Sequence, residues 1–188
     1  MKIATNYTID AEGLVCPMPI VKTKKMIDEL SPGEVLEIRA TDRGSLADMK
    51  GWAQTTGHQY LGTQEEGEVL IHYLRKSNPE EVSEVEAFEQ ESSNEELEEF
   101  INHENVTVLD VREPAEYAFG HVPGAHSIPL GELNERMDEL DKEQEIYVVC
   151  RTGNRSNLAA HQLKEAGFTK LANVVPGMSE WDGPTETK

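Results

Sequence analysis

An acidic stretch without lysine or arginine divides this chain into two parts. Residues 77–99 carry 10 acidic side chains and no basic ones. Like charges in such a stretch repel one another, so it favours a flexible or frayed-helical segment over a packed one. A chain of 188 residues is long enough for one medium domain or two small ones. The stretch therefore predicts two small domains joined by an acidic linker, at residues 1–76, 77–91 and 92–188.

The linker leaves one alternative open. Three of its apolar residues lie at three-residue spacing, and this places them on one side of a helix: Val82, Val85 and Phe88. A short helix docked on a domain is therefore the alternative to a flexible linker.

The charge of the chain excludes several classes of partner. The formal net charge is -19, which argues against nucleic acid or an anionic membrane. The first residues form no apolar signal core, and no apolar run approaches the length that crosses a membrane. We therefore expect a protein of the reducing cytoplasm, and the sequence predicts no cofactor.

The chain has two cysteines, Cys16 and Cys150. Neither a C-x-x-C pair nor a zinc-binding spacing accompanies them, and the scattered histidines supply no ligand set, so no metal site is predicted. We expect two free thiols, because stable disulfides are rare in the cytoplasm. The alternatives are a Cys16–Cys150 disulfide or two inert buried thiols.

The sequence around Cys150 predicts a reactive thiol. The β-branched run Ile146–Val149 delivers Cys150 into a short polar loop, and a helical pattern follows from Ser156. Backbone N–H groups and the dipole at a helix N-terminus stabilise an anion. They also favour the thiolate, which is the form that attacks. The loop therefore predicts sulfur or oxyanion chemistry at Cys150.

Strands and helices alternate through the second domain. Its predicted elements are a helix capped by Ser93, a strand at Val106–Asp110, a helix with Leu133, Met137 and Leu140, a strand at Ile146–Val149, a helix with Leu158, Leu163 and Ala166, and a strand at Asn173–Val175. This alternation predicts an α/β fold with a parallel sheet covered on both faces. Ligands bind at the carboxyl ends of such strands, where Asp110 and Cys150 lie. Asp110 and Arg112 are expected to form a buried pair that supports the Cys150 loop.

Four segments of this domain resemble the rhodanese family, in the same order. They are Leu109–Glu113, Glu116–Ala125, Cys150–Ser156 and Pro176–Trp181, with Pro176 where a glycine is expected. The resemblance implies a three-layer α/β/α domain and a sulfurtransferase whose Cys150 carries a persulfide. The residues expected to bind the substrate are Arg151, Thr152, Gly153, Asn154 and Arg155.

The composition of the loop suits this chemistry. A Cys150 thiolate attacks the sulfane sulfur of thiosulfate or of a small persulfide, and backbone N–H groups of the loop can converge on the resulting anionic sulfur. Gly153 lets the backbone turn tightly, while Arg151 and Arg155 supply positive charge for an anionic donor. An acceptor thiol then takes the sulfur by attacking the persulfide.

The first domain shows a different order of elements. A strand is predicted at Ile3–Ile9, a helix from Pro17 to about Leu30, a strand at Glu34–Ala40, a helix from Ser45 to Gly57, and a hairpin of strands at Gln59–Gln64 and Val69–Arg75. The second helix is expected to direct Leu46, Met49 and Ala53 inward, and Ser45 with Asp48 resembles a capping box. The order β-α-β-α-β-β predicts a two-layer α/β sandwich with both helices on one face of the sheet.

Cys16 lies at the turn between the first strand and the first helix. Pro17 suits the first helical position, which makes Cys16 the N-cap or nearly so, with free N–H groups close by. Lysines along the helix add positive charge. These features favour a thiolate at Cys16, as at Cys150.

The segments Gly13–Pro19 and Ala40–Ser45 resemble the TusA/SirA family of sulfur-carrier proteins, across essentially all of residues 1–76. The resemblance implies that Cys16 carries a persulfide and hands its sulfur to a partner protein. The alternative is a cysteine that only caps a helix as a small buried residue. Together the two resemblances predict a relay from Cys150 to Cys16, assisted by the high effective concentration that a tether provides.

Two other functions remain open. A phosphatase or arsenate reductase also uses a cysteine in an anion-binding loop, but typically places the arginine one residue further from the cysteine than Arg155 stands. A non-catalytic sulfide or redox sensor would instead use reversible modification of Cys16 and Cys150. A measured sulfur-transfer turnover distinguishes these functions from a sulfurtransferase.

Overall fold

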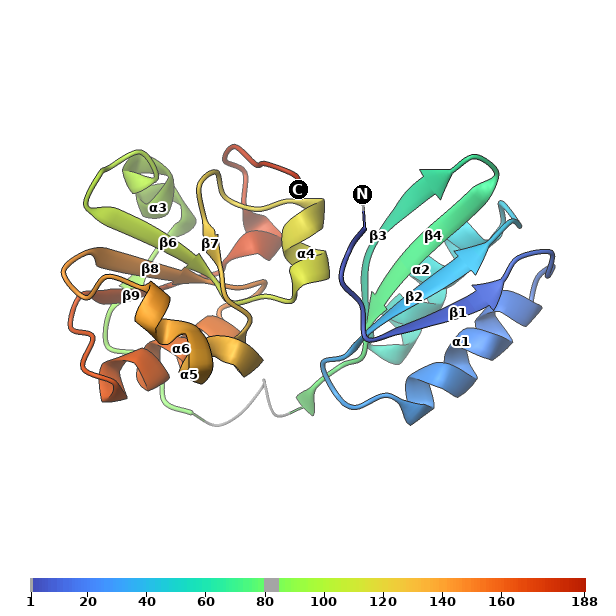
Figure 1. Cartoon of the computed structure of the whole chain (residues 1–188), viewed down its shortest axis with the longest axis horizontal. Helices are drawn as coiled ribbons and strands as arrows, with labels where there is room; N and C mark the ends of the chain where they lie inside the picture. The colour runs from blue at the N-terminus through green and yellow to red at the C-terminus, as the bar shows by residue number, and fades with distance from the viewer. Residues whose placement is uncertain (1, 80–84) are drawn as a thin grey trace. The chain divides into compact units, whose positions relative to one another are not determined.

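A computed structural model gives the fold of the chain, and it describes residues 2–79 and 85–188. These two ranges form two compact units, each with its own sheet and core (Figure 1). The predicted linker residues 80–84, Val82 among them, lie outside the described residues. Within the described ranges, every helix is too short or too polar to span a membrane.

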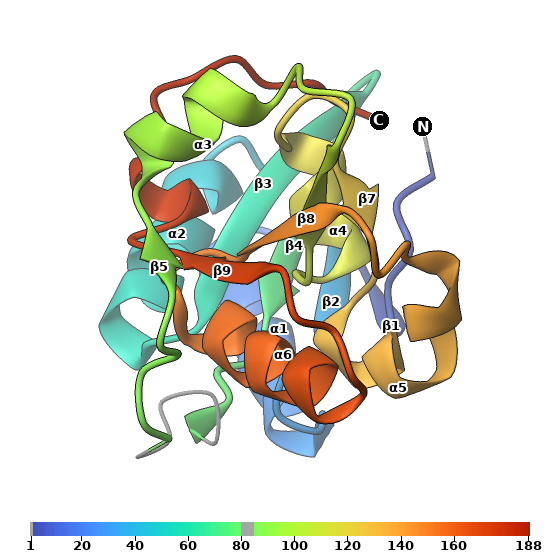
Figure 2. The same cartoon turned by 90° about the vertical axis from the view of Figure 1, so that its left-hand side faces the viewer.

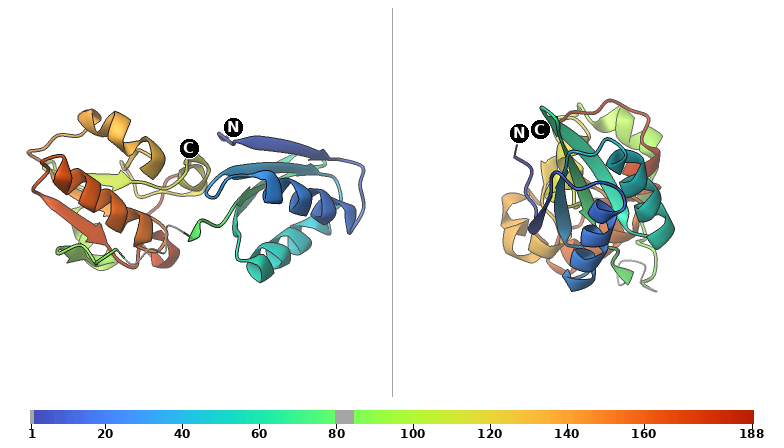
Figure 3. Two further views of the ribbon diagram at one scale, coloured as in Figure 1. Left: turned by 90° about the horizontal axis from the view of Figure 1, so that it is seen from below. Right: turned by 90° about the vertical axis from the view of Figure 1, so that its right-hand side faces the viewer.

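The first unit is a four-stranded sheet with two helices on one face (Figure 3). Its elements are β1 (Tyr7–Ala11), α1 (Met18–Glu29), β2 (Val35–Ala40), α2 (Ser45–Thr56), β3 (Gln59–Glu66) and β4 (Val69–Arg75). The strand order is β1-β2-β4-β3, with β1 parallel to β2 and the other pairs antiparallel. Apolar side chains of both helices and the sheet form the core between the layers. The predicted two-layer α/β sandwich is confirmed.

Two boundaries near Cys16 differ from the prediction. Strand β1 begins at Tyr7, whereas the predicted strand began at Ile3, which is buried but lies outside the paired residues of the strand. Helix α1 begins at Met18, so Pro17 is the N-cap rather than the first helical residue, and Cys16 precedes the cap. Pro19 occupies the early helical position instead, where a missing N–H costs nothing.

Helix α2 turns a different face to the core than predicted. Ser45 is buried and its Oγ hydrogen-bonds to Nε2 of the buried His72 at 2.9 Å, so it does not form the predicted capping box with Asp48. Because Ser45 and Met49 lie on the buried face, Leu46 falls one residue off it and is exposed. The prediction of Leu46 as a core residue was wrong, since a polar side chain of the sheet binds Ser45 there.

The second unit is a five-stranded parallel sheet with helices on both faces (Figure 2). Its elements are β5 (Glu91–Ser92), α3 (Asn94–Phe100), β6 (Val106–Asp110), α4 (Pro114–Phe119), β7 (His126–Ser127), α5 (Leu133–Arg136), β8 (Glu145–Val149), α6 (Asn154–Glu165) and β9 (Leu171–Val174). The strand order is β5-β9-β8-β6-β7. One core lies between the sheet and α5 with α6, and the other between the sheet and α3 with α4. The predicted three-layer α/β/α fold is confirmed.

Helix boundaries in this unit follow local capping. Ser93 caps α3, because its Oγ accepts from the Glu96 N–H at 3.1 Å while the Glu96 carboxylate accepts from the Ser93 N–H at 3.2 Å. Helix α6 begins at Asn154 rather than Ser156, since Gly153 caps it with a φ of 90°. The predicted helix through Leu133 is only the short α5, flanked by 3-10 turns.

The C-terminal end of the predicted linker packs on the second unit. Phe88 is buried in the core beside α6, and its N–H donates to Asn157 Oδ1 at 2.7 Å. The Glu86 carbonyl accepts from Asn157 Nδ2 at 3.2 Å. Residues 85–90 are not helical, and Val85 is exposed. Residues 86–90 therefore belong to the second unit, because one aromatic residue anchors an otherwise acidic segment.

Candidate functional site

Cys150 directly follows the last residue of β8, at the carboxyl end of the parallel sheet. Its side chain is buried, and Sγ accepts a hydrogen bond from the Gly153 N–H at 3.1 Å. The Ser156 hydroxyl lies 3.3 Å from the same sulfur. Gly153 adopts a φ of 90°, a conformation that other residues rarely adopt, and this lets the backbone turn its N–H toward the sulfur. The loop therefore aims a backbone donor and a hydroxyl at the thiol.

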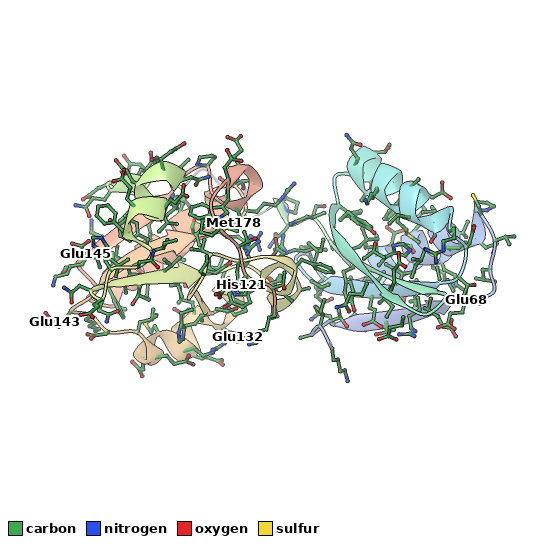
Figure 4. All side chains as sticks on the ribbon, turned by 90° about the horizontal axis from the view of Figure 1, so that it is seen from above. Glu68, His121, Glu132, Glu143, Glu145 and Met178 are labelled. Carbon is green, nitrogen blue, oxygen red and sulfur yellow. The ribbon has the colours of Figure 1, made fainter. Side chains whose placement is uncertain are left out.

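A second loop holds the backbone on the other side of the cysteine. The carbonyl oxygens of Cys150 and Arg151 accept hydrogen bonds from the N–H groups of Met178 and Ser179, each at 2.8 Å (Met178 is labelled in Figure 4). Gly177 packs so closely that a Cβ on it would lie 2.5 Å from the Cys150 carbonyl oxygen. Only glycine fits this contact at a φ of 94°. These contacts fix the backbone of Cys150 and Arg151.

Two buried asparagines fix both loops. Asn94 of α3 donates from Nδ2 to the Gly177 carbonyl at 2.9 Å and accepts from the Gly177 N–H at 3.1 Å. Asn173 of β9 donates to the Gly153 carbonyl at 3.2 Å. Neither residue was predicted to belong to the site. The sequence signal for Asn173 was a polar amide within an otherwise apolar strand. Asn94 gave no such signal, because asparagine is common at the start of a helix.

The two arginines of the loop have different surroundings. Arg155 is buried, and its guanidinium donates two hydrogen bonds to the carboxylate of Glu116 in α4, at 2.7 and 2.8 Å. We expected Arg155 to attract an anionic donor, but its charge is compensated by Glu116, as a buried charge requires. Arg151, in contrast, is exposed, as are Thr152 and Asn154. The exposed positive charge of the loop is therefore that of Arg151.

Asp110 and Arg112 form a buried ion pair at the end of β6. Arg112 donates from Nη2 to Asp110 Oδ2 at 2.6 Å and from Nε to Oδ1 at 2.9 Å. Arg112 Nη2 also donates to the Gly120 carbonyl at 2.8 Å. In the sheet, Asp110 pairs with Val149, which is the residue that precedes Cys150. A supporting role for this pair toward the Cys150 loop stays a prediction.

Cys16 lies in the first unit, in the loop between β1 and α1, and it is exposed. Its backbone N–H donates to Asp42 Oδ2 at 3.0 Å, and the Gly13 N–H donates to Thr41 Oγ1 at 2.8 Å. These bonds tie the β1–α1 loop to the β2–α2 loop. The two segments that carry the TusA/SirA resemblance therefore meet at Cys16.

The charges around Cys16 are the reverse of those expected. A hydrogen bond with the Asp48 carboxylate raises the pKa of the Cys16 thiol, and desolvation and the negative charges of Asp48 and Asp42 raise that pKa further. Lys22 of α1 donates to the Asp10 carbonyl at 2.9 Å. The prediction that this turn favours a thiolate was wrong, because the β2–α2 loop and the start of α2 bring carboxylates to it.

Both cysteines are free thiols in the structure. In the part of the chain that the structure describes, no three histidine, cysteine, aspartate or glutamate side chains are grouped as metal ligands would be.

Comparisons with known proteins match both units. Residues 93–183 match a profile described as a rhodanese-like domain, and residues 7–76 match one described as sulfurtransferase TusA. The Bacillus subtilis protein YrkF, whose name proposes a sulfur carrier, is 49% identical over 189 residues, which cover 96% of this chain and 98% of YrkF.

Two further proteins match one unit each. The sulfur carrier protein TusA of Allochromatium vinosum is 41% identical over 72 residues, which cover 38% of this chain and 95% of that protein. Among solved structures, a rhodanese-related protein of Thermoplasma volcanium is 32% identical with a TM-score of 0.49, covering 53% of this chain and 99% of that one.

Proposed function

Because the chain belongs to the sulfurtransferase and sulfur-carrier family that joins a TusA domain to a rhodanese-like domain, we propose that it is loaded with sulfur at Cys150. The donor is thiosulfate or a low-molecular-weight persulfide. The sulfur then passes to acceptor thiols, among them Cys16 of the same chain and thiols of small molecules or partner proteins. We place this chemistry in a reducing cytoplasm, where thiols are kept free of stable disulfides.

The observation that carries this proposal is the Gly153 N–H, 3.1 Å from the Cys150 sulfur. A thiolate at Cys150 attacks the outer sulfur of thiosulfate. The S–S bond of thiosulfate breaks, sulfite leaves with the electron pair, and Cys150 becomes a persulfide anion. The Gly153 N–H is aimed at Sγ, the atom that carries the negative charge of the attacking thiolate, and it stabilises that charge without reorganisation, as an oxyanion hole does.

The exposed residues of the Cys150 loop suit an anionic donor. Arg151, Thr152 and Asn154 are exposed there, and Arg151 supplies a positive charge. The guanidinium of Arg155 is engaged by the Glu116 carboxylate. This engagement weighs against a phosphatase, in which the corresponding arginine would hold the oxyanion.

The transfer step needs no further reagent. An acceptor thiolate attacks the outer sulfur of the Cys150 persulfide in its protonated form, and the Cys150 thiolate leaves with the electron pair. The proton of the acceptor thiol balances the charge on Cys150. The Gly153 N–H then stabilises the released thiolate, so the same donor serves both half-reactions.

The proposal is tested with a steady-state assay and with mass spectrometry of the intact chain. Thiosulfate and glutathione persulfide are compared as donors for the natural chain and for the Cys150→Ser and Cys16→Ser variants. We expect Cys150→Ser to lose turnover and to load Cys16 much more slowly, whereas Cys16→Ser still forms a persulfide on Cys150. Loading of Cys16 at an unchanged rate in Cys150→Ser would overturn the relay.

A further inference from the structure

The backbone N–H groups around the two cysteines are used in opposite ways. At Cys150, the Gly153 N–H donates to the cysteine sulfur itself and favours its thiolate. At Cys16, the cysteine's own N–H donates to Asp42 Oδ2 at 3.0 Å, and the Gly44 N–H donates to Oδ1 of the same carboxylate at 3.1 Å. The Asp42 carboxylate thus takes up two N–H donors of this turn and places a negative charge beside Cys16.

Asp48, in the first turn of α2, adds a second negative charge near Cys16, and hydrogen bonding and charge from its carboxylate raise the pKa of the Cys16 thiol. The thiol itself is exposed, so reagents reach it from solvent in the field of these two carboxylates. The nearby cation Lys22 is held at the Asp10 carbonyl, at 2.9 Å.

We propose that Asp42 and Asp48 make Cys16 selective by charge, so that it takes sulfur from neutral persulfides and reacts slowly with anionic sulfur donors. The inference rests on the sulfur-carrier role proposed above. The preferred donor is a protonated persulfide, R–S–S–H, as a cysteine of a protein presents it. Thiosulfate and the anionic persulfides of small molecules are disfavoured, because their charge is repelled before they reach the sulfur.

The transfer to Cys16 is balanced for a neutral donor. The Cys16 thiolate attacks the outer sulfur of R–S–S–H, the S–S bond breaks, and R–S⁻ leaves with the electron pair. The proton that left the Cys16 thiol neutralises R–S⁻, so the net change is R–S–S–H plus thiol to R–S–H plus Cys16 persulfide. The raised pKa of Cys16 is the expected companion of the same two carboxylates.

Charge selectivity can be measured without any sulfur transfer. In the full chain with Cys150→Ser, Cys16 is the single cysteine and is alkylated by iodoacetamide, which is neutral, or by iodoacetate, which is anionic. Both reagents attack through the same thiolate. The ratio of their rates at one pH therefore cancels the thiolate fraction and reports the charge around the sulfur.

We expect Asp42→Asn and Asp48→Asn each to lower the iodoacetamide-to-iodoacetate ratio by about two- to fivefold. A unit charge at contact distance in water changes the rate of a singly charged reagent by up to about fivefold. Asparagine keeps only one of the two acceptor oxygens, so Asp42→Asn also gives up either the Cys16 or the Gly44 N–H bond, whereas Asp48→Asn leaves both bonds in place. Glu29→Gln is the matched control, because Glu29 ends α1 about 16 Å from its start, beyond the screening length of about 8–10 Å.

The ratio also separates this inference from the proposed function. A ratio unchanged in both aspartate variants, or lowered equally by Glu29→Gln, would overturn the charge selectivity whatever Cys16 carries. A lowered ratio in a chain whose Cys16 never receives sulfur would leave the selectivity standing and overturn the carrier role. If the charge selectivity and the carrier role both hold, direct loading of Cys16 by thiosulfate in the Cys150→Ser chain becomes faster when Asp48→Asn is added.

Discussion

Asn94 binds both polar groups of the Gly177 backbone, donating to its carbonyl at 2.9 Å and accepting from its N–H at 3.1 Å. Gly177 in turn packs against the Cys150 carbonyl, and the next residue, Met178, donates to that carbonyl. A buried amide on α3 therefore positions the backbone that carries the reactive sulfur. It does so without touching the sulfur.

Replacing Asn94 is expected to slow the chemical step. Asn94→Ala leaves the Gly177 N–H and carbonyl without a partner, and each such buried group costs about 1–3 kcal/mol of stability. The Gly177 loop then holds the Cys150 backbone less firmly, so kcat falls while KM for thiosulfate changes little. Steady-state kinetics and urea unfolding measure the two effects, with the exposed Glu98→Gln on the same helix as the control. A raised KM at an unchanged kcat would contradict this positioning role.

Removing the Arg155 guanidinium is expected to destabilise the second unit. Its two hydrogen bonds to Glu116 are buried, and breaking such a pair from one side costs about 3–5 kcal/mol, because the other charge stays buried. Arg155→Ala should therefore lower the midpoint of urea unfolding strongly. The double variant Glu116→Leu with Arg155→Met should recover much of that loss, since it removes both charges. Equal stability of Arg155→Ala and the natural chain would show that the pair contributes little.

Arg151 is expected to affect donor binding and not stability. Its side chain is exposed, and surface substitutions usually change stability by about 0.5 kcal/mol or less. Arg151→Ala should raise KM for thiosulfate several-fold and weaken the salt dependence of kcat/KM, because the anion loses an attracting charge. Arg151→Lys should restore most of the affinity. An unchanged KM in Arg151→Ala would remove this residue from the donor site.

Local sequence signals predicted the parts of the structure that depend on near neighbours. The strand Val106–Asp110 has the predicted boundaries because a nearly continuous apolar run favours a strand buried on both faces. The cap of α3 was predicted at Ser93, and Glu96 completes a capping box there. The position of Cys150 at the end of a strand followed from the same local pattern.

Features that depend on distant residues were not predicted. Arg155 meets Glu116 39 positions away, and Asn94 meets Gly177 83 positions away. The thiol of Cys16 was expected to be activated by its own helix, yet carboxylates of the neighbouring loop and helix raise its pKa. No local spacing encodes such contacts, because strand order and loop packing create them. The fold was therefore more accessible from the sequence than the electrostatics of its sites.

A buried histidine gives the first unit a pH-dependent stability. His72 of β4 has no exposed surface, and its ring nitrogens lie 2.9 Å from Ser45 Oγ and 2.9 Å from the Tyr60 hydroxyl. Burial lowers the pKa of His72 to about 4, and the charge of Lys50 acts in the same direction. The contacts with Ser45 and Tyr60 and the burial of the side chain together favour the neutral imidazole ring of His72.

The sign of the pH effect follows from these values. The unfolded chain binds a proton at His72 below about pH 6.5, whereas the folded unit binds it only below a pH of about 4. Between these values the unfolded state binds more protons, so stability falls as the pH is lowered. The loss contributed by this histidine reaches about 3 kcal/mol near pH 4.

Urea unfolding of the first unit between pH 7 and pH 4 measures this loss. Trp52 packs against the core of that unit and reports it alone when the second tryptophan is removed as Trp181→Phe. In this background His72→Gln should be less stable at pH 7, because an imidazole that binds Ser45 and Tyr60 is lost, but its stability should fall much less toward pH 4. Carboxylates titrate equally in both chains. The difference between the two slopes of unfolding free energy against pH is therefore caused by His72. Parallel slopes would mean that His72 is protonated in the folded state and that its burial does not exclude the charged ring.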